Sequence, residues 1–378
     1  MNNLSALITE LCPNGVEYKE LQSVLKIKNG SDYKSFGEGD IPVYGSGGII
    51  AHTNRFAYDK PSVLIPRKGS VDKLYYVDVP FWNVDTIFYT EINTGLVIPR
   101  YVYHCLLREH LEKLNTAGGV PSLTQNVLNK VKIPVPPLEV QHEIVRILDT
   151  FTELTAELTA ELTARKQQYA YYRDNLLTFR IDIIRKSLDE LCIISAAGDA
   201  PKEALSLTKT AEYQIPVISN GIGENAFYGY TDKPKITEPA VTVAARGTIG
   251  YAEYRDYPYY PIIRLLSVIP KNTDVLATKY LYYCLQGKKY NVPSGGIPQL
   301  TAPELKKVVI PVPPLPVQQR IANVLDNFDA ICTDLNIGLP AEIEARKKQY
   351  EFYRDQLLTF AAQGDTILTD RQTDRQTD

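Results

Sequence analysis

Two glycine-containing turns carry the cationic side chains best suited to contact a polyanion. The first is Arg67-Lys68-Gly69-Ser70 and the second is Arg246-Gly247-Thr248. Glycine lets the backbone approach a ligand closely, and Lys or Arg can hold a phosphate group or the edge of a guanine base. These seven residues are therefore candidate DNA-binding residues. The alternative for each cation is an ordinary solvated turn charge.

The patterns that catalysis would require are missing from the sequence. No G-x-x-x-x-G-K-[ST] motif provides an ATP site, and the four histidines lack the spacing of metal ligands. The pairs Pro136-Pro137 and Pro313-Pro314 have apolar flanks, whereas the [DNS]-P-P-[YF] tetrad of amino-methyltransferases has polar and aromatic ones. We expect no catalytic residue, no metal and no cofactor in this chain.

Composition limits the class of protein further. The 41 Lys and Arg residues nearly balance the 44 Asp and Glu residues, so any DNA-facing surface must be a local patch. The five cysteines lie far apart without a C-x-x-C pair, which argues against a disulfide framework and for a reducing compartment. Neither a secretory signal nor an apolar run of about 20 residues is present. We expect a cytoplasmic protein without a membrane partner.

An internal repeat organises the chain. Lys132–Leu138 recurs at Val309–Leu315, a shift of 177 residues, and differs only at its first position. The same shift carries Gly118-Gly119-Val120-Pro121, Gln141, Leu148-Asp149 and Phe151 onto their mates. Ala164–Tyr169 recurs at Ala345–Tyr350 with a shift of 181, so the second copy holds four extra residues. Upstream of each copy the sequence similarity is weak. This indicates that the repeated helical blocks share one function, whereas the two upstream blocks have diverged in theirs.

A helix with a narrow apolar seam follows each Pro-Pro pair. Apolar residues recur in steps of three and four, the rhythm of a coiled coil. Two helices of one design most simply pack on each other, although two unrelated amphipathic helices on separate cores remain the alternative. The residues that we expect to form spacer and partner-docking surfaces are Ile144, Ile147, Phe151, Leu154, Leu158, Ile321, Val324 and Phe328.

The diverged blocks are typical of α+β domains. Short β-branched or aromatic runs alternate with Gly turns, and each block has one predicted helix, at 100–114 and 278–286. The predicted strands include the uninterrupted run Ile262–Ile269. The predicted organisation is a domain at 1–137, a spacer helix at 138–180, a second domain at 181–314, a second spacer helix at 315–363 and a disordered tail at 364–378. Gly338-Leu339-Pro340 predicts a break in the second helix, because proline does not continue a helix interior.

The sequence resembles the specificity (S) subunits of type I restriction–modification systems. The resemblance covers nearly the whole chain and rests on the duplicated Pro-Pro-Leu blocks with Gln141 and Gln318. It also rests on Arg67–Ser70, on Phe81-Trp82-Asn83-Val84-Asp85-Thr86, on the Thr-Ala-Glu-Leu units at Thr155–Leu162, and on the two Arg-Lys-x-Gln-Tyr endings. It implies two similar target-recognition domains joined by two long helices, packed as an antiparallel coiled coil with pseudo-two-fold symmetry.

The resemblance also implies a role and a set of partners. Each domain would read half of a bipartite, asymmetric site in double-stranded DNA, and the helices would dock two methyltransferase (modification) subunits. Those partners would methylate adenine with S-adenosylmethionine, and restriction/translocase subunits would supply the chemistry that needs ATP and Mg²⁺. This chain would be the non-catalytic component.

Two other classes of protein remain open from the sequence. One is a stand-alone DNA-modifying enzyme with an unrecognised site, which should bind S-adenosylmethionine or ATP by itself. The other is a coiled-coil scaffold whose globular blocks bind protein, which should lack salt-sensitive affinity for DNA.

Overall fold

The chain forms two compact units. The computed structural model describes residues 2–114, 122–179, 183–290 and 298–360. Unit 1 comprises Met1–Thr159 and Glu342–Asp378, and unit 2 comprises Ala160–Ala341. The repeated glycine motif at 118–121, residues 295–297 of its mate and the predicted tail at 364–378 lie outside the described residues.

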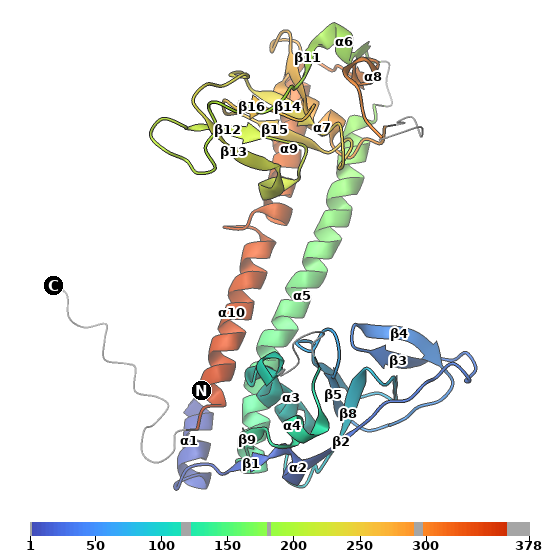
Figure 1. The fold of residues 1–378 in the computed structure, drawn as a ribbon, viewed down its shortest axis with the longest axis vertical. Coiled ribbons are helices and arrows are strands. Elements are labelled where there is room, and N and C mark those ends of the chain that lie inside the picture. The colour runs from blue at the N-terminus through green and yellow to red at the C-terminus, as the bar shows by residue number, and fades with distance from the viewer. Residues whose placement is uncertain (1, 115–121, 180–182, 291–297, 361–378) are drawn as a thin grey trace, which may run out of the picture. The chain divides into compact units, whose positions relative to one another are not determined.

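Unit 1 is an α+β body built on three small sheets (Figure 1). The sheets have the strand orders β2-β8-β5-β6, β4-β3-β7 and β1-β9. The strands are β1 (Tyr18–Glu20), β2 (Leu25–Lys28), β3 (Ile41–Gly45), β4 (Gly48–Thr53), β5 (Ser62–Pro66), β6 (Tyr75–Val77), β7 (Trp82–Asn83), β8 (Ile87–Ile92) and β9 (Lys132–Pro134). The helices before the long helix are α1 (Asn2–Leu11), α2 (Leu21–Val24), α3 (Pro99–Arg108), the 3-10 helix η1 (Leu111–Leu114) and α4 (Gln125–Asn129).

Unit 2 repeats this topology strand for strand. Its sheets have the orders β11-β17-β14-β15, β13-β12-β16 and β10-β18. The strands are β10 (Arg185–Ser187), β11 (Cys192–Ala196), β12 (Ile215–Ile218), β13 (Phe227–Thr231), β14 (Ala240–Val243), β15 (Ala252–Arg255), β16 (Tyr260–Pro261), β17 (Leu266–Pro270) and β18 (Val309–Pro311). The helices are α6 (Leu188–Leu191), the 3-10 helix η2 (Gly223–Ala226), α7 (Thr278–Leu285), α8 (Ala302–Lys306) and α9 (Leu315–Thr333).

The register of the strands is also repeated. The edge strand β7 pairs in parallel with β3 through Val43 and Trp82, and β16 pairs in parallel with β12 through Val217 and Tyr260. In each unit the central strand, β5 or β14, is buried along its whole length. A strand that is buried on both faces has a continuous apolar sequence, and for this reason both strands were predicted from the sequence.

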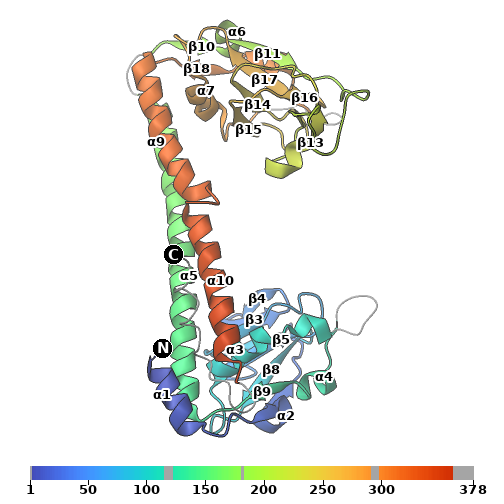
Figure 2. The same ribbon diagram turned by 90° about the vertical axis from the view of Figure 1, so that its left-hand side faces the viewer.

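Long helices continue from both Pro-Pro segments. Helix α5 (Leu138–Leu177) begins directly after Pro137, and α9 begins after Pro314; each of these prolines accepts the first amide hydrogen bonds of its helix. The first half of α5 belongs to unit 1 and the remainder to unit 2. In unit 1, α1 lies along the first turns of α5 (Figures 1 and 2), and Leu4 shares a core with Val140 and Ile144.

Each unit contains one pair of packed long helices. In unit 1, α10 (Leu339–Leu357) packs on α5, where the rings of Phe151 and Tyr353 stack with centroids 5.1 Å apart. In unit 2, the ring centroids of Tyr172 of α5 and Phe328 of α9 lie 5.6 Å apart. Burial raises the pKa of the Cys332 thiol on α9, and the charge of Lys166 on α5 opposes this shift, so Lys166 lies near Cys332. Residue numbers rise along one helix as they fall along the other, so the α5–α9 pair is antiparallel.

The second long helical segment is divided. Helix α9 ends at Thr333 and α10 starts at Leu339, with a turn between them. Pro340 lies in the first turn of α10, where the missing amide proton is not needed. The backbone of Gly338 is so close to the carbonyls of Ala330 and Asp334 that a Cβ atom would come within 2.6 Å of both oxygens.

Two elements differ from the sequence prediction. The run Ile262–Ile269 is not one strand, because the turn Ile262–Leu265 separates β16 from β17. The helix predicted at 100–114 ends at Arg108, and His110 takes a left-handed φ of 48° before η1. None of the helices in the described part of the chain is both long and apolar enough to cross a membrane.

Candidate nucleic-acid interface

Three loops of unit 1 meet at one end of its sheets. We call them loop cluster 1: residues 45–48, 67–71 and 84–86. The amide of Ser46 donates to Thr86 Oγ1 at 3.3 Å, and the amide of Arg67 donates to the Thr86 carbonyl at 3.0 Å. The Tyr75 hydroxyl donates to the Ser46 carbonyl at 3.2 Å. These bonds hold the first candidate turn beside a β-hairpin and the turn that follows β7.

The two cations of the first candidate turn are in different environments. The Arg67 guanidinium lies over the Phe88 ring, 5.1 Å from its centroid, and its buried Nε has no hydrogen-bond partner among the described residues. Lys68 is exposed, and its backbone bridges to Ser122. Of the two, Lys68 is the side chain available to a ligand, while Arg67 supports the turn from beneath.

Gly69 meets a conformational requirement of this turn. Its φ of +78° lies in the left-handed region, which side chains other than Gly, Asn and Asp adopt at a cost. A Cβ atom there would make only an ordinary 3.6 Å contact with the Oγ of Ser46. The glycine is therefore needed for the bend itself. Ser70, the last candidate residue of the turn, is partly buried.

Unit 2 builds an equivalent loop cluster around Asn220. Loop cluster 2 consists of residues 219–223, 244–250 and 262–265. The Asn220 Oδ1 accepts from the Ala245 amide at 2.8 Å, and its Nδ2 donates to the Ile263 carbonyl at 2.5 Å. The Thr248 hydroxyl donates to the Asn220 carbonyl at 2.6 Å. One side chain therefore ties all three loops together, and the candidate residue Thr248 is part of the tie.

Arg246 is held in place by Gln299, which occupies the position of Ser122 in the second copy of the repeat. Its Nε and Nη2 donate to the Oε1 of Gln299 at 3.0 and 2.7 Å, and the side chain is partly exposed. Gly247 beside it has a φ of +67°, and no atom of the described residues lies within 4 Å of a Cβ position there. The second candidate turn thus presents an oriented guanidinium beside a glycine.

Sequence reasoning missed the most strained turn of loop cluster 2. Ile263 and Arg264 have φ values of +54° and +61°, and the Leu265 amide donates to the Ile262 carbonyl at 3.1 Å. This is the geometry of a type I′ turn, which normally contains Asn or Gly. Left-handed backbone at such residues costs about 1–2 kcal/mol each, and strain of this kind concentrates at functional sites. The signal in the sequence was a single Arg inside an apolar run.

The equivalent turn of loop cluster 1 is different in charge and shape. There the Ile87 amide donates to the Val84 carbonyl at 3.2 Å, and the central residues Asp85 and Thr86 keep negative φ. Asp85 and Arg264 are both exposed. The two clusters therefore share a scaffold but present opposite charges at this tip.

Nucleophilic chemistry finds no support in the cysteines. All five are free, and burial raises the pKa of Cys105, Cys192 and Cys284, the last two to about 12. Such thiols stay protonated at neutral pH and are poor nucleophiles. Among the described residues, no group of three or more His, Cys, Asp or Glu side chains could hold a metal ion.

Some of the predicted spacer residues belong to the domain cores, some make contacts between the long helices, and some are partly exposed. Ile144 and Ile321 are buried in the cores of units 1 and 2, and Ile147 packs on the unit 1 core. Phe151 and Phe328 make the interhelical ring contacts described above. Leu154 and Leu158 are partly buried, and Val324 is 38% exposed. Because Leu148 is also fully buried, the covered face of α5 is broader at its start than the predicted seam.

Comparison with known proteins shows the same domain twice. The family profile of the type I restriction modification DNA specificity domain matches residues 13–165 and 182–345. S.MpnORF89P of Mycoplasma pneumoniae, which bears the name of a type I specificity subunit, is 35% identical over 338 residues, covering 85% of this chain and 97% of that protein. The specificity subunit of the type I restriction enzyme EcoR124I/EcoR124II of Escherichia coli is 35% identical over 302 residues, covering 72% and 73%.

A solved structure shows the same fold. The crystal structure of the type I restriction–modification S subunit from M. genitalium aligns with a TM-score of 0.62, covering 91% of this chain and 96% of that one at 15% identity. The duplicated family match and the length of the similarity to relatives agree with the duplicated sheets and loop clusters. The chain belongs to the family of type I restriction–modification specificity subunits, the non-catalytic DNA-specificity components of their complexes.

Proposed function

We propose that loop clusters 1 and 2 each read one half of a bipartite, asymmetric site in double-stranded DNA. One observation carries this proposal: the same three loops are built twice on one strand order, yet their exposed tips differ. Lys68 stands where the second unit has Arg246, and the turn after β7 exposes Asp85 whereas the turn after β16 exposes Arg264, one position further along. Side chains of different charge and donor pattern select different base edges, so two unlike half-sites follow. Arg67, Gly69, Ser70, Gly247 and Thr248 shape the turns that present these tips.

The domain limits belong to the same proposal. Residues 1–137 and 181–314 would be the two target-recognition domains, with spacer helices at 138–180 and 315–363. In this arrangement α5 is common to both units, and the tandem Thr-Ala-Glu-Leu units in α5 set part of the distance between the half-sites.

The long helices would dock two methyltransferase subunits. On α9, Val317, Val324 and Ile331 recur every seven residues and are 40%, 38% and 44% exposed. A seven-residue apolar repeat is the seam that a partner helix packs against. Helix α1 covers the matching start of α5 in unit 1, where Val140 is fully buried.

The chemistry would belong to the partners. S-adenosylmethionine would bind the methyltransferase subunits, and ATP with Mg²⁺ would bind restriction/translocase subunits. This chain would select the sequence in the cytoplasm, where the DNA lies, without a membrane partner.

Single-molecule sequencing of adenine methylation tests the proposal in the host, with and without this chain. We expect a bipartite, asymmetric methylated motif that disappears when the chain is deleted and returns with it. A motif that persists without the chain would contradict the proposal. Binding of S-adenosylmethionine by the purified chain alone would favour the stand-alone enzyme instead. Absence of salt-sensitive DNA affinity even with methyltransferase present would favour the scaffold.

A further inference from the structure

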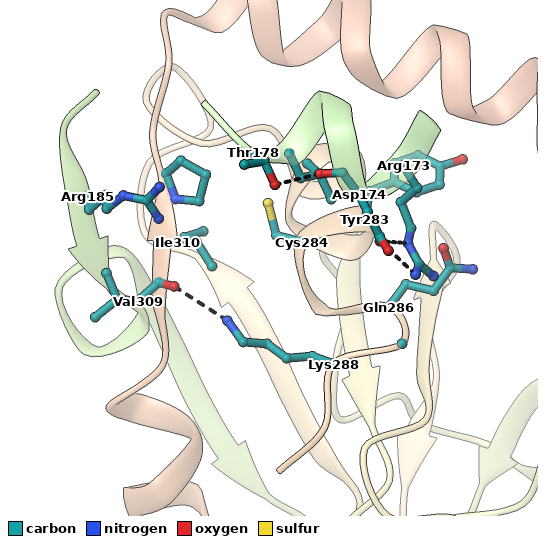
Figure 3. Close-up of a pocket in the computed structure, with 13 residues that line it drawn as sticks. Arg173, Asp174, Thr178, Arg185, Tyr283, Cys284, Gln286, Lys288, Val309 and Ile310 are labelled. Carbon is teal, nitrogen blue, oxygen red and sulfur yellow. Dashed lines mark hydrogen bonds and ion pairs between the residues drawn. The ribbon is translucent and has the colours of Figure 1, made fainter. Parts of the chain in front are cut away.

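A basic pocket lies in unit 2 (Figure 3). Its volume is about 400 Å³, and it is bounded by the end of α5, the end of α7 and strands β10 and β18. Three cationic side chains line it: Arg173, Arg185 and Lys288. We call it the cationic pocket.

The positive charge of this pocket is poorly compensated. Arg173 pairs with Asp174 at 2.8 Å, but the carboxylate is largely exposed. Within the described ranges, no carboxylate lies within ion-pair distance of Arg185 or Lys288, and Lys288 Nζ reaches only the Val309 carbonyl at 3.5 Å. Both residues are exposed, and partial burial of the Lys288 ammonium, together with the charge of Arg185, lowers its pKa, although Cys284 opposes the shift. Like charges gathered in this way repel each other unless an anion joins them.

The first repeat shows what the pocket has lost. At the equivalent position Arg108 donates to the Leu358 carbonyl at 3.1 Å and to Thr359 Oγ1 at 2.9 Å, so its guanidinium covers the end of α10. Unit 2 has Gly287 there, with a φ of +71°, and a Cβ atom would come within 2.8 Å of Arg173 Nη1.

Two further residue differences between the repeats make this place in unit 2 more positively charged. Tyr101 and Tyr280 donate to the carbonyls of the equivalent prolines Pro134 and Pro311, and the same offset of 179 residues puts Lys288 in the place of Glu109. Arg185 takes the place of Tyr18, because Tyr18 pairs with Pro134 as Arg185 pairs with Pro311. The second copy therefore has an opened cavity with more positive charge. The end of α5 contributes a partial negative charge of about half an elementary charge, which three cations outweigh.

We infer that the cationic pocket binds a phosphate group. Its surroundings favour a phosphate of the DNA backbone as the source. Gln286, Gly287 and Lys288 also line an adjoining groove of about 580 Å³ that extends to Thr248 and Gly250 of loop cluster 2. A backbone that runs from the reading loop along this groove brings a phosphate to Lys288 and Arg185. This inference rests on the proposed function for its source of phosphate, but not for the chemistry of the pocket.

The test uses the full chain assembled with its methyltransferase subunits. Arg185→Ala with Lys288→Ala removes two pocket cations, and Lys186→Ala with Lys289→Ala removes their exposed or half-exposed sequence neighbours as the matched control. Affinity for a duplex containing the methylated motif is measured between about 50 and 200 mM salt, the range over which phosphate contacts change affinity strongly. Each lost phosphate contact lowers the slope of log K against log salt by about 0.9. We expect that decrease in the pocket variant only, with unchanged methylated sequence.

Two further measurements identify the source of the phosphate. Neutral methylphosphonate placed at single backbone positions should weaken wild-type binding at one position that no longer matters in the pocket variant. Calorimetry with inorganic phosphate and with adenosine monophosphate tests a free phosphate compound. Binding of either compound to the wild type but not to the pocket variant, with unaltered DNA binding, would keep the phosphate site and assign it to a free ligand.

The inference and the proposed function fail differently. If the pocket variant matches its control in salt slope, methylphosphonate pattern and calorimetry, the cationic pocket is not a phosphate site. If the wild-type complex shows no sequence preference on DNA, the proposed function fails, and the calorimetry alone decides the pocket.

Discussion

At the scale of single residues, one buried glutamine joins each long helix to its domain, Gln141 on α5 and Gln318 on α9. The Oε1 of Gln141 accepts from the Ile98 amide at 2.8 Å, and its Nε2 donates to the carbonyls of Leu96 and Pro136 at 2.9 and 2.8 Å. Gln318 makes the same three bonds, to Ala277, Val275 and Pro313, at 2.8–2.9 Å. The repeat marked both glutamines in the sequence. Two of the three partners of each glutamine lie more than 40 residues away along the chain, so only the fold identifies them.

Gln141→Ala should therefore destabilise unit 1 without changing the recognised bases. The substitution leaves one buried amide and two carbonyls unpaired, and each such group costs about 1–3 kcal/mol. Gln167→Ala, an exposed glutamine on the same helix, is the matched control. Thermal unfolding should show a lower midpoint for Gln141→Ala only. Equal midpoints for the two variants would mean that the three bonds contribute little.

Lys68→Ala and Arg246→Ala should each weaken DNA binding without unfolding the protein. If the side chain contacts a phosphate, the salt slope falls by about 1; if it contacts a base, the loss is about 1–3 kcal/mol with relaxed specificity at one position. Lys348→Ala, an exposed cation on α10, is the control. Binding titrations with the methyltransferase complex measure both effects. Unchanged affinity and sequence preference in both variants would return these residues to the role of solvated turn charges.

At the scale of elements, a buried polar cluster fixes α10 to α3 and α5 in unit 1. The two ring nitrogens of His104 lie 2.8 Å from the Tyr350 hydroxyl and 2.9 Å from Asp149 Oδ1, and Arg100 also donates to that carboxylate. Burial lowers the pKa of His104, and Arg100 and Arg354 lower it further, although Asp149 opposes them. Burial raises the pKa of Asp149, but the hydrogen bonds from His104 and Arg100 bring it below its usual value.

The stability of unit 1 should therefore fall as the pH drops through about 6.5. The unfolded chain takes up a proton at His104 near its ordinary pKa of about 6.5, while the folded chain resists it, so this stability is present above that pH and is lost below it. Asp149 stabilises the fold at neutral pH, because its folded pKa lies below its ordinary value, and this contribution is lost only as the pH falls below that ordinary value of about 3.9. His104→Gln should reduce the pH dependence of the unfolding midpoint, and His142→Gln, an exposed control, should not. Identical pH profiles for wild type and His104→Gln would contradict this.

The tandem units of α5 give a prediction about spacing. Thr155-Ala156-Glu157-Leu158 and Thr159-Ala160-Glu161-Leu162 lie within one continuous helix. A third unit after Leu162 should extend the helix by about 6 Å, because its residues are good helix formers. DNA rises about 3.4 Å per base pair along a strand, so the spacer should lengthen by one to about two base pairs with both half-sites unchanged.

Methylome sequencing of the insertion strain measures that spacer, and deletion of one unit should shorten it. Altered bases with the original spacer would contradict the role of α5 as a ruler. Four added residues also step the coiled-coil seam, which unwinds it locally without destroying it.

At the scale of the whole molecule, the sequence predicted what repetition and burial make visible. The buried strands β5 and β14 and the helix starts after Pro-Pro follow from local patterns, and the repeat implied one fold built twice. The Ile262–Leu265 turn did not follow, because the run around it is mostly apolar without Gly, Asn or Pro, and the turn is held by long-range bonds such as that from the Ile263 amide to the Gly198 carbonyl at 2.9 Å. For the same reason Arg264 was missed. The position of the Arg67 guanidinium over Phe88 also depends on a strand that begins 20 residues further along the chain.

The central claim is that each unit reads its own half-site, and a block exchange tests it most directly. Residues Glu17–Pro134 are replaced by the corresponding block of a relative with a different known motif, and the methylome of the host is sequenced. The account predicts that one half of the bipartite motif changes to that of the relative, while the other half and the spacer stay the same. A change in both halves, or in neither, would contradict it.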